Sequence, residues 1–224
     1  MFPHKHYFIR HAHRDAFDPN DWGHDISITS QGQESSRQFG RALARSRIET
    51  IWTSPIRRCI QTAEEIKKGF GIDVPNYSSS LLGDPGFMIL DPKLAENAFQ
   101  KYQLVEIVEL LLGGKSIPGF CSVNIGCSRI LRKLSENKHS NQIWVSHDIN
   151  ICILACWVFQ RTHSENMMPG FLEGIEFSFD EIDIFAHFRG LRTKIDETVL
   201  RVTLDSIEKP AFSNRKLNSS KVRS

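Results

Sequence analysis

Three short apolar segments, each followed at once by cationic or histidine residues, constrain this chain more than any other feature. Residues 7–10, 48–53 and 142–146 have the length and composition of strands, and helical patterns lie between them along the chain. An order of strand, helix, strand and helix is typical of an α/β domain with a largely parallel sheet. Ligands of such sheets bind outside the carboxyl ends of the strands. We therefore expect a binding site where these three segments end.

Helix signals follow the first two predicted strands. A polar loop covers residues 12–25, and a helix capped by Thr29 or Ser30 then runs to about residue 45. Ser54 at the N-cap and Pro55 at position N1 predict a second helix, which ends near residue 69. The apolar stripe expected to face the core from this helix consists of Ile56, Ile60, Ala63 and Ile66.

The remaining chain is less regular until the third predicted strand. Residues 75–140 contain two Pro-containing turns and two helical patterns, near 102–112 and 122–137, which indicates a helical insertion. A buried helix follows the third strand to about residue 159, and residues 174–188 favour a hairpin turned at Asp180-Glu181. We expect one domain over residues 1–208.

The basic charge of the chain is concentrated at its end. The formal net charge is +2, but residues 209–224 hold five bases and no acid, so residues 1–208 carry a net −3. This tail is polar and almost without apolar residues, which favours a solvated, disordered terminus over a nucleic-acid-binding arm. We therefore predict no nucleic-acid partner.

Composition excludes several further classes of protein. The longest apolar run, residues 151–159, is about half of what a membrane span requires. The first residues lack the apolar region and cleavage site of a secretion signal, so the expected address is cytoplasmic. The five cysteines are then expected to be reduced thiols, with Cys152 and Cys156 packed in the core.

The first strand is followed by two arginines and two histidines within five residues, Arg10 to Arg14. Neighbouring positive charge lowers the pKa of His11, so its imidazole is expected to be neutral and nucleophilic near pH 7. A neutral imidazole among arginines suits attack on a phosphoryl group. For His13 the alternative is the ordinary role of a structural histidine. A metal site is the rival interpretation, but so many arginines argue against one. Its ligands would be His4, His6, His11 and His13.

The second and third strands are also followed by candidate anion ligands. Arg57 and Arg58 occupy the first turn of the predicted helix, where the helix dipole disfavours a cation and a bound anion would compensate. The alternative is that both point into water and pair with Glu64 or Glu65. Because successive helical residues lie about 100° apart, one arginine can point outward while the other faces the sheet edge.

His147 and Asp148 follow the third strand. Asp148 is either a helix N-cap or a proton donor to a leaving group, and His147 would then join the phosphate ligands. Together the three strand ends supply a nucleophile, a cationic clamp and an acid. Other phosphate chemistries lack their motifs, because the chain has no Cys-x5-Arg loop and no Gly-x4-Gly-Lys-[Ser/Thr] loop.

Four ordered segments resemble the motifs of one family, the histidine phosphatase (phosphoglycerate mutase-like) superfamily. Residues 8–12, Phe-Ile-Arg-His-Ala, resemble its Arg-His-Gly motif with Ala12 in the glycine position, and residues 28–32 are similar to its Leu-Thr-x-x-Gly segment. Residues 52–63 contain its Ser-Pro-x-x-Arg-x-x-Gln-Thr pattern, and residues 145–148 resemble its closing histidine motif. The His-Asp pair at 147–148 is nearer to the histidine acid phosphatase branch.

This resemblance implies a Rossmann-like three-layer α/β sandwich with a mostly parallel central sheet and a phosphohistidine mechanism that needs no metal or cofactor. His11 would be the nucleophile and Asp148 the acid, with Asp84 or Glu96 of the insertion as alternative acids. The phosphate ligands would be Arg10, Arg14, Arg58 and His147.

The expected activity is hydrolysis of a small phosphomonoester, with inorganic phosphate as product. One alternative is a phosphomutase of the same superfamily. The other is a phospho-ligand binding or regulatory protein with little turnover. The feature that favours this alternative is Ala12 in the position where the family motif has glycine.

Overall fold

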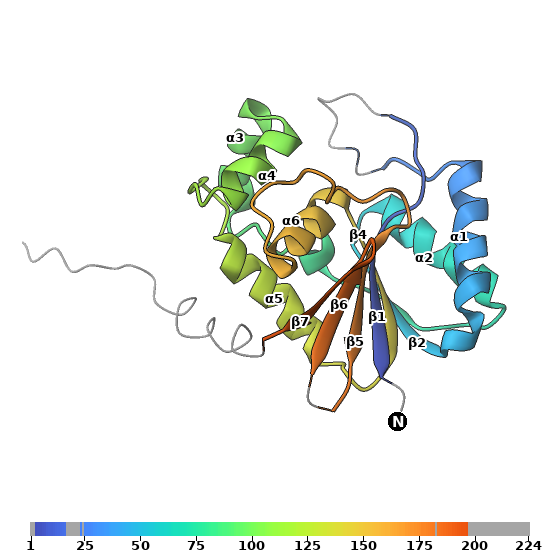
Figure 1. Cartoon of the computed structure of the whole chain (residues 1–224). Coiled ribbons are helices and arrows are strands. Elements are labelled where there is room, and N and C mark those ends of the chain that lie inside the picture. The colour runs from blue at the N-terminus through green and yellow to red at the C-terminus, as the bar shows by residue number, and fades with distance from the viewer. Residues whose placement is uncertain (1–2, 17–22, 24, 182, 197–224) are drawn as a thin grey trace, which may run out of the picture.

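The computed structural model describes residues 3–16, 23, 25–181 and 183–196. Helices and strands alternate through most of this part of the chain (Figure 1). In chain order they are β1 (His4–Arg10), α1 (Ser30–Leu43), β2 (Ile48–Thr53), α2 (Arg57–Phe70), β3 (Asn76–Ser78), α3 (Pro92–Lys101), α4 (Leu104–Leu112), α5 (Val123–Ser135), β4 (Asn141–Ser146), α6 (Asp148–Val158), β5 (Gly174–Phe179), β6 (Ile184–Phe188) and β7 (Leu191–Ile195), with short 3-10 turns at Ala44–Ser46 and Ser80–Leu82.

The strands form one seven-stranded sheet in the order β3-β2-β4-β1-β5-β6-β7. The pairings among β3, β2, β4 and β1 are parallel, whereas β5, β6 and β7 join by antiparallel pairings. The α/β class is therefore confirmed, but the sheet is mixed rather than mostly parallel along its whole width. The hairpin predicted over residues 174–188 is present as β5 and β6, and it makes the second half antiparallel because tight turns join only antiparallel neighbours.

Helices cover both faces of the sheet, which gives three layers (Figure 1). Successive residues of a strand point to opposite faces. Phe8 and Trp144 accordingly lie in the core shared with α4, α5 and α6, while Ile9 and Val145 lie in the core shared with α1 and α2. All five cysteines are buried free thiols. No described helix has the length and apolar character needed to cross a membrane.

The start of α1 agrees with the prediction from the sequence, whereas the start of α2 does not. Thr29 is the N-cap of α1, as predicted, and accepts a hydrogen bond from the Gly32 N–H. The predicted start of α2 was wrong, because Ile56 is its N-cap and the helix begins at Arg57, but the helix is present and ends at Phe70, close to the predicted end. Ser54 and Pro55 stay in the preceding loop, where the Ser54 hydroxyl accepts a hydrogen bond from the Ile56 N–H.

The apolar stripe of α2 agrees with the prediction only in part. Ile60 is 38% exposed, so it does not belong to the buried face. That face carries the predicted Ala63 and Ile66 together with Cys59, and these residues pack toward β2. Two members of the predicted stripe, Ala63 and Ile66, are therefore confirmed, whereas Ile60 is not.

The predicted insertion is part of the layered fold. Helices α4 and α5 lie close to the two predicted helical patterns. Two elements were not predicted from the sequence. One is strand β3, at the edge of the sheet, and the other is helix α3, which begins at Pro92 and has Asp91 as its N-cap. The predicted basic tail lies outside the described residues.

Candidate active site

The site lies where the parallel strands β2, β4 and β1 end side by side. His11 follows β1, Ser54 follows β2 and His147 follows β4. The sheet ladder continues into these residues, because the His11 N–H donates to the Ser146 carbonyl and the Ser54 N–H donates to the Val145 carbonyl. His11 and Ser54 are therefore fixed at their backbones by the sheet, at the edge that the sequence predicts.

His11 is almost fully buried, with 2% of its surface exposed. Its Nδ1 lies 2.8 Å from the Ala12 carbonyl, to which an Nδ1–H donates, so Nε2 keeps its lone pair. Burial, aided by the nearby guanidinium groups of Arg58 and Arg10, lowers the pKa of His11 to about 3. The imidazole is therefore neutral at physiological pH, which is the state a nucleophile needs.

Ala12 fits at the position where the family motif usually has glycine. It is fully buried, its N–H donates to the Thr62 hydroxyl at 2.9 Å, and its backbone does not have a positive φ. Nothing at this position therefore requires glycine.

His147 lies half-buried beside His11, with the two ring centroids 5.5 Å apart. Arg58 Nη2 donates to His147 Nδ1 at 3.1 Å, and His147 Nε2 lies 3.0 Å from Ser54 Oγ and 3.6 Å from Cys59 Sγ. Burial holds the pKa of His147 well below its usual value. Because the Ser54 hydroxyl can either donate or accept, it supports either neutral tautomer of this ring.

Arg10 and Asp148 form an ion pair at the same edge. Arg10 Nη2 lies 2.8 Å from Asp148 Oδ2, and Arg10 Nη1 donates to the Pro169 carbonyl at 2.9 Å. The guanidinium carbon lies 4.2 Å from the centre of the Phe171 ring. Asp148 is the first residue of α6 rather than its N-cap, and its Oδ1 accepts from the Ile149 N–H. Its second carboxylate oxygen thus faces the site.

Arg58 lies deeper than the other arginines of the site. It is 7% exposed, and its Nη1 donates to the Gly23 carbonyl at 2.6 Å. The Nε atoms of Arg58 and Arg10 are buried and have no hydrogen-bond partner among the described residues. Burial, together with the positive charge of Arg10, lowers the pKa of Arg58. A bound anion would provide the missing acceptors.

Arg14 approaches the same cluster from the loop after β1. Its Nη1 donates to the Asp15 carbonyl, and burial together with Arg58 lowers its pKa, against the influence of Asp148. Three guanidinium groups thus lie near a single carboxylate, that of Asp148. The net charge around His11 is therefore positive. Such a pocket favours a phosphate dianion, because charge-assisted hydrogen bonds to phosphate oxygens are strong.

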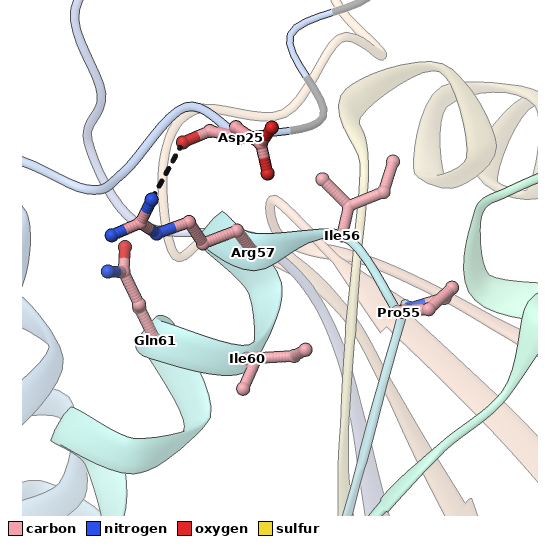
Figure 2. Close-up of a pocket in the computed structure, with 6 residues that line it drawn as sticks. All are labelled: Asp25, Pro55, Ile56, Arg57, Ile60 and Gln61. Carbon is pink, nitrogen blue, oxygen red and sulfur yellow. Dashed lines mark hydrogen bonds between the residues drawn. The ribbon is translucent and has the colours of Figure 1, made fainter.

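Arg57 points away from this cluster, as the helical spacing predicts for one of the two neighbours. It is exposed and its Nη1 donates to the Asp25 carbonyl at 3.5 Å, at an open cavity of about 410 Å³ on the outer side of α2 (Figure 2). The alternative pairing with Glu64 or Glu65 was wrong. Those carboxylates pair with other residues, Lys67 with Glu64 and both Arg37 and Lys68 with Glu65.

The two alternative acids differ in their distance from the site. Asp84 is exposed and follows Gly83, where an added Cβ would lie 2.5 Å from His147 Nε2. Glu96 is on the exposed side of α3, whose buried residues are Ala95 and Ala98. Asp84 is therefore at the rim of the site, and it stays the alternative to Asp148 as the proton donor.

The sequence analysis missed four contributors to this site. Cys59 and Ser54 contact His147, and the Pro169 carbonyl and Phe171 ring contact Arg10. Ser54 carried a signal, because it belongs to the Ser-Pro segment, but that signal was interpreted as a helix cap. Among the described residues, no group of three or more histidine, cysteine or acidic side chains could hold a metal ion.

Comparison with known proteins finds a family match over the first part of the chain. Residues 6–81, which contain His11 and Arg58, match the family model of the histidine phosphatase superfamily (branch 1). This part of the chain, about a third of its length, is thus similar to the histidine phosphatase superfamily. The match ends before His147 and Asp148, so a closer relation to the acid phosphatase branch stays a prediction. No curated protein sequence matches the chain.

Several solved structures are similar to this one in fold, at low sequence identity. A phosphoserine phosphatase mutant from Entamoeba histolytica, in complex with phosphoserine, has a TM-score of 0.54 at 16% identity, over 86% of this chain and 95% of that one. Bacillus stearothermophilus YhfR reaches 0.58 at 16% identity, over 83% and 96%. A phosphoglycerate mutase from Bacillus anthracis reaches 0.53 at 15% identity, over 89% and 96%. These likenesses establish the fold.

Proposed function

We propose that this protein is a phosphomonoesterase that acts through a phosphohistidine at His11 on a small phosphorylated substrate. One observation carries the proposal: a buried, neutral imidazole whose Nε2 is free of the Ala12 hydrogen bond lies among three arginines. A neutral nitrogen nucleophile and a cationic clamp are the two groups that phosphoryl transfer to a protein side chain requires.

Substrate binding uses the positive charge of the pocket. Arg10, Arg14 and Arg58 donate to the phosphoryl oxygens, and the buried Nε atoms of Arg10 and Arg58 are the donors that lack a partner in the described part of the protein. His147 donates a further hydrogen bond from Nδ1 in the tautomer where the Ser54 hydroxyl donates to its Nε2. The dianion replaces Arg58 as the partner of that nitrogen.

The first chemical step forms a bond between His11 Nε2 and phosphorus and breaks the bond between phosphorus and the ester oxygen. The leaving oxygen needs a proton, which Asp148 supplies from its position beside Arg10. In the second step water attacks the phosphohistidine, its proton passes to Asp148, and inorganic phosphate leaves. The Ala12 carbonyl accepts from His11 Nδ1–H throughout and steadies the positive charge on the phosphorylated ring.

The test is hydrolysis of p-nitrophenyl phosphate together with trapping of the intermediate. We expect phosphate release and, after a rapid quench with radiolabelled substrate, a protein-bound label that is stable to base and sensitive to acid. Binding of inorganic phosphate without hydrolysis would instead indicate the low-turnover binding protein. Interconversion of phosphoglycerates faster than hydrolysis would indicate a phosphomutase.

A further inference from the structure

The loop between α6 and β5, residues 159–173, holds Arg10 from two directions. The Arg10 N–H donates to the Glu173 carbonyl at 2.9 Å, and the Leu172 N–H donates to the Arg10 carbonyl at 3.2 Å. Its side chain donates to the Pro169 carbonyl and stacks on Phe171. Both the backbone and the guanidinium of Arg10 are thus placed by this loop.

Arg189, in the turn between β6 and β7, fastens that loop. Its Nε and Nη2 donate to the two oxygens of the Glu173 carboxylate, at 2.6 and 2.5 Å. Its Nη1 donates to the Asn166 carbonyl at 2.8 Å, and its Nη2 also donates to the Met168 carbonyl at 3.0 Å. One side chain therefore ties three loop residues, spread over Asn166 to Glu173, to the sheet.

The backbone at Arg189 does not favour arginine. Its φ is +46°, and Gly190 follows at +77°, which is the pattern of a two-residue hairpin turn that prefers Asn-Gly. The ion pair with Glu173 is also partly exposed, with 38% of the Arg189 side chain and 34% of the Glu173 side chain accessible. Exposed pairs of this kind contribute little to stability. Neither the turn nor stability explains the residue.

We propose that Arg189 is a positioning residue for phosphate binding, which acts by holding the loop that orients Arg10. The proposal rests on the proposed function only in that Arg10 binds the phosphoryl oxygens. The Arg10 guanidinium is shared between the Pro169 carbonyl and Asp148. With the loop released, the Pro169 contact is lost and Asp148 alone sets the orientation of the guanidinium.

The test compares two arginines of one hairpin. Arg189→Asn suits the turn but removes the guanidinium, whereas Arg192→Asn changes an exposed arginine of β7 that stacks on Phe185. We expect Arg189→Asn to weaken the Kd for inorganic phosphate and to raise KM by several-fold, with a smaller change in kcat and nearly unchanged Tm. Arg192→Asn should bind phosphate like the wild type. Arg189→Lys cannot make the paired contact with Glu173, so its Kd for phosphate should lie between those of the wild type and Arg189→Asn.

A double-mutant cycle separates positioning from a general structural role. In an Arg10→Ala background, Arg189→Asn should cause no further loss of phosphate affinity, because the group that it positions is gone. Wild-type phosphate affinity in Arg189→Asn, or an equal loss in both backgrounds, would overturn the inference. The proposed function fails separately, if phosphate binds but no ester is hydrolysed; a wild type that binds no phosphate would refute both.

Discussion

The parallel and antiparallel halves of the sheet serve the site in different ways. In the parallel half, β2, β4 and β1 end at one edge, and the residue after each strand points its side chain into the site. In the antiparallel half, β5, β6 and β7 alternate in direction, and their connections support Arg10 through backbone carbonyls and Arg189. Parallel strands concentrate reactive groups, whereas antiparallel strands here supply the supporting contacts.

Removing the nucleophile of the parallel half should have the largest effect on activity. His11→Ala should lower hydrolysis by at least about a thousandfold, because no other group replaces the lost nitrogen. Steady-state rates on p-nitrophenyl phosphate measure this, and a cooperative thermal transition verifies the fold. His13→Ala is the matched control, since that ring is bonded to Thr29 and should cost much less. More than a few percent of activity left in His11→Ala would exclude the phosphohistidine route.

Asp148 should have the next largest effect, and one that depends on the leaving group. Asp148→Asn keeps an oxygen that can accept from the Ile149 N–H but has no acidic proton. A general acid contributes about 10²–10⁴-fold where the leaving group is basic. We expect a loss in this range for an alkyl phosphate, a small loss for p-nitrophenyl phosphate and little change in Tm. Equal losses on both substrates would move the role to Asp84, for which Asp84→Asn is the control.

The neighbouring arginines at the start of α2 should separate by direction. Inorganic phosphate should raise the Tm of the wild type, since it binds only the folded state. Arg58→Ala should remove most of this shift, because Arg58 is buried against His147. Arg57→Ala should keep it, because Arg57 points to the outer cavity (Figure 2). Equal shifts in the two variants would show that the phosphate lies elsewhere.

The parallel half could be predicted from the sequence because its signals are local. Residues 48–53 have strand composition between clear loop signals, and the structure places β2 over the same residues. The spacing of Arg57 and Arg58 on a helix predicted that they would diverge, as they do. The start of α2 was mispredicted because Ser54 and Pro55 form a good helix start locally, while the Ser54 hydroxyl contacts His147 in the folded chain.

The antiparallel half could not be predicted in the same way. Pro169 acts through its carbonyl, which every residue has, so no residue type marks the position. Arg189 lies 179 positions along the chain from Arg10 and works through Glu173, two steps that no spacing rule connects. The hairpin itself was visible from residues 174–188, but its contribution depends on which loop folds over it. Tertiary contacts of this kind need the structure.

The smallest predicted effect concerns two buried histidines, one within β1 and one just after it, and it is an effect on stability rather than on rate. His6, at the start of the strand, is fully buried, and burial lowers its pKa to about 4. The folded chain then binds fewer protons than the unfolded chain between about pH 6.5 and 4, so stability falls as the pH falls through this window, by up to about 1.4 kcal/mol per pH unit for one group. His6→Gln should flatten the dependence of unfolding free energy on pH, measured by urea titration. His11→Ala should flatten it at the other end of the strand, down to about pH 3. An unchanged slope in both variants would mean that the two imidazoles are not held neutral, and the neutral nucleophile would fail with them.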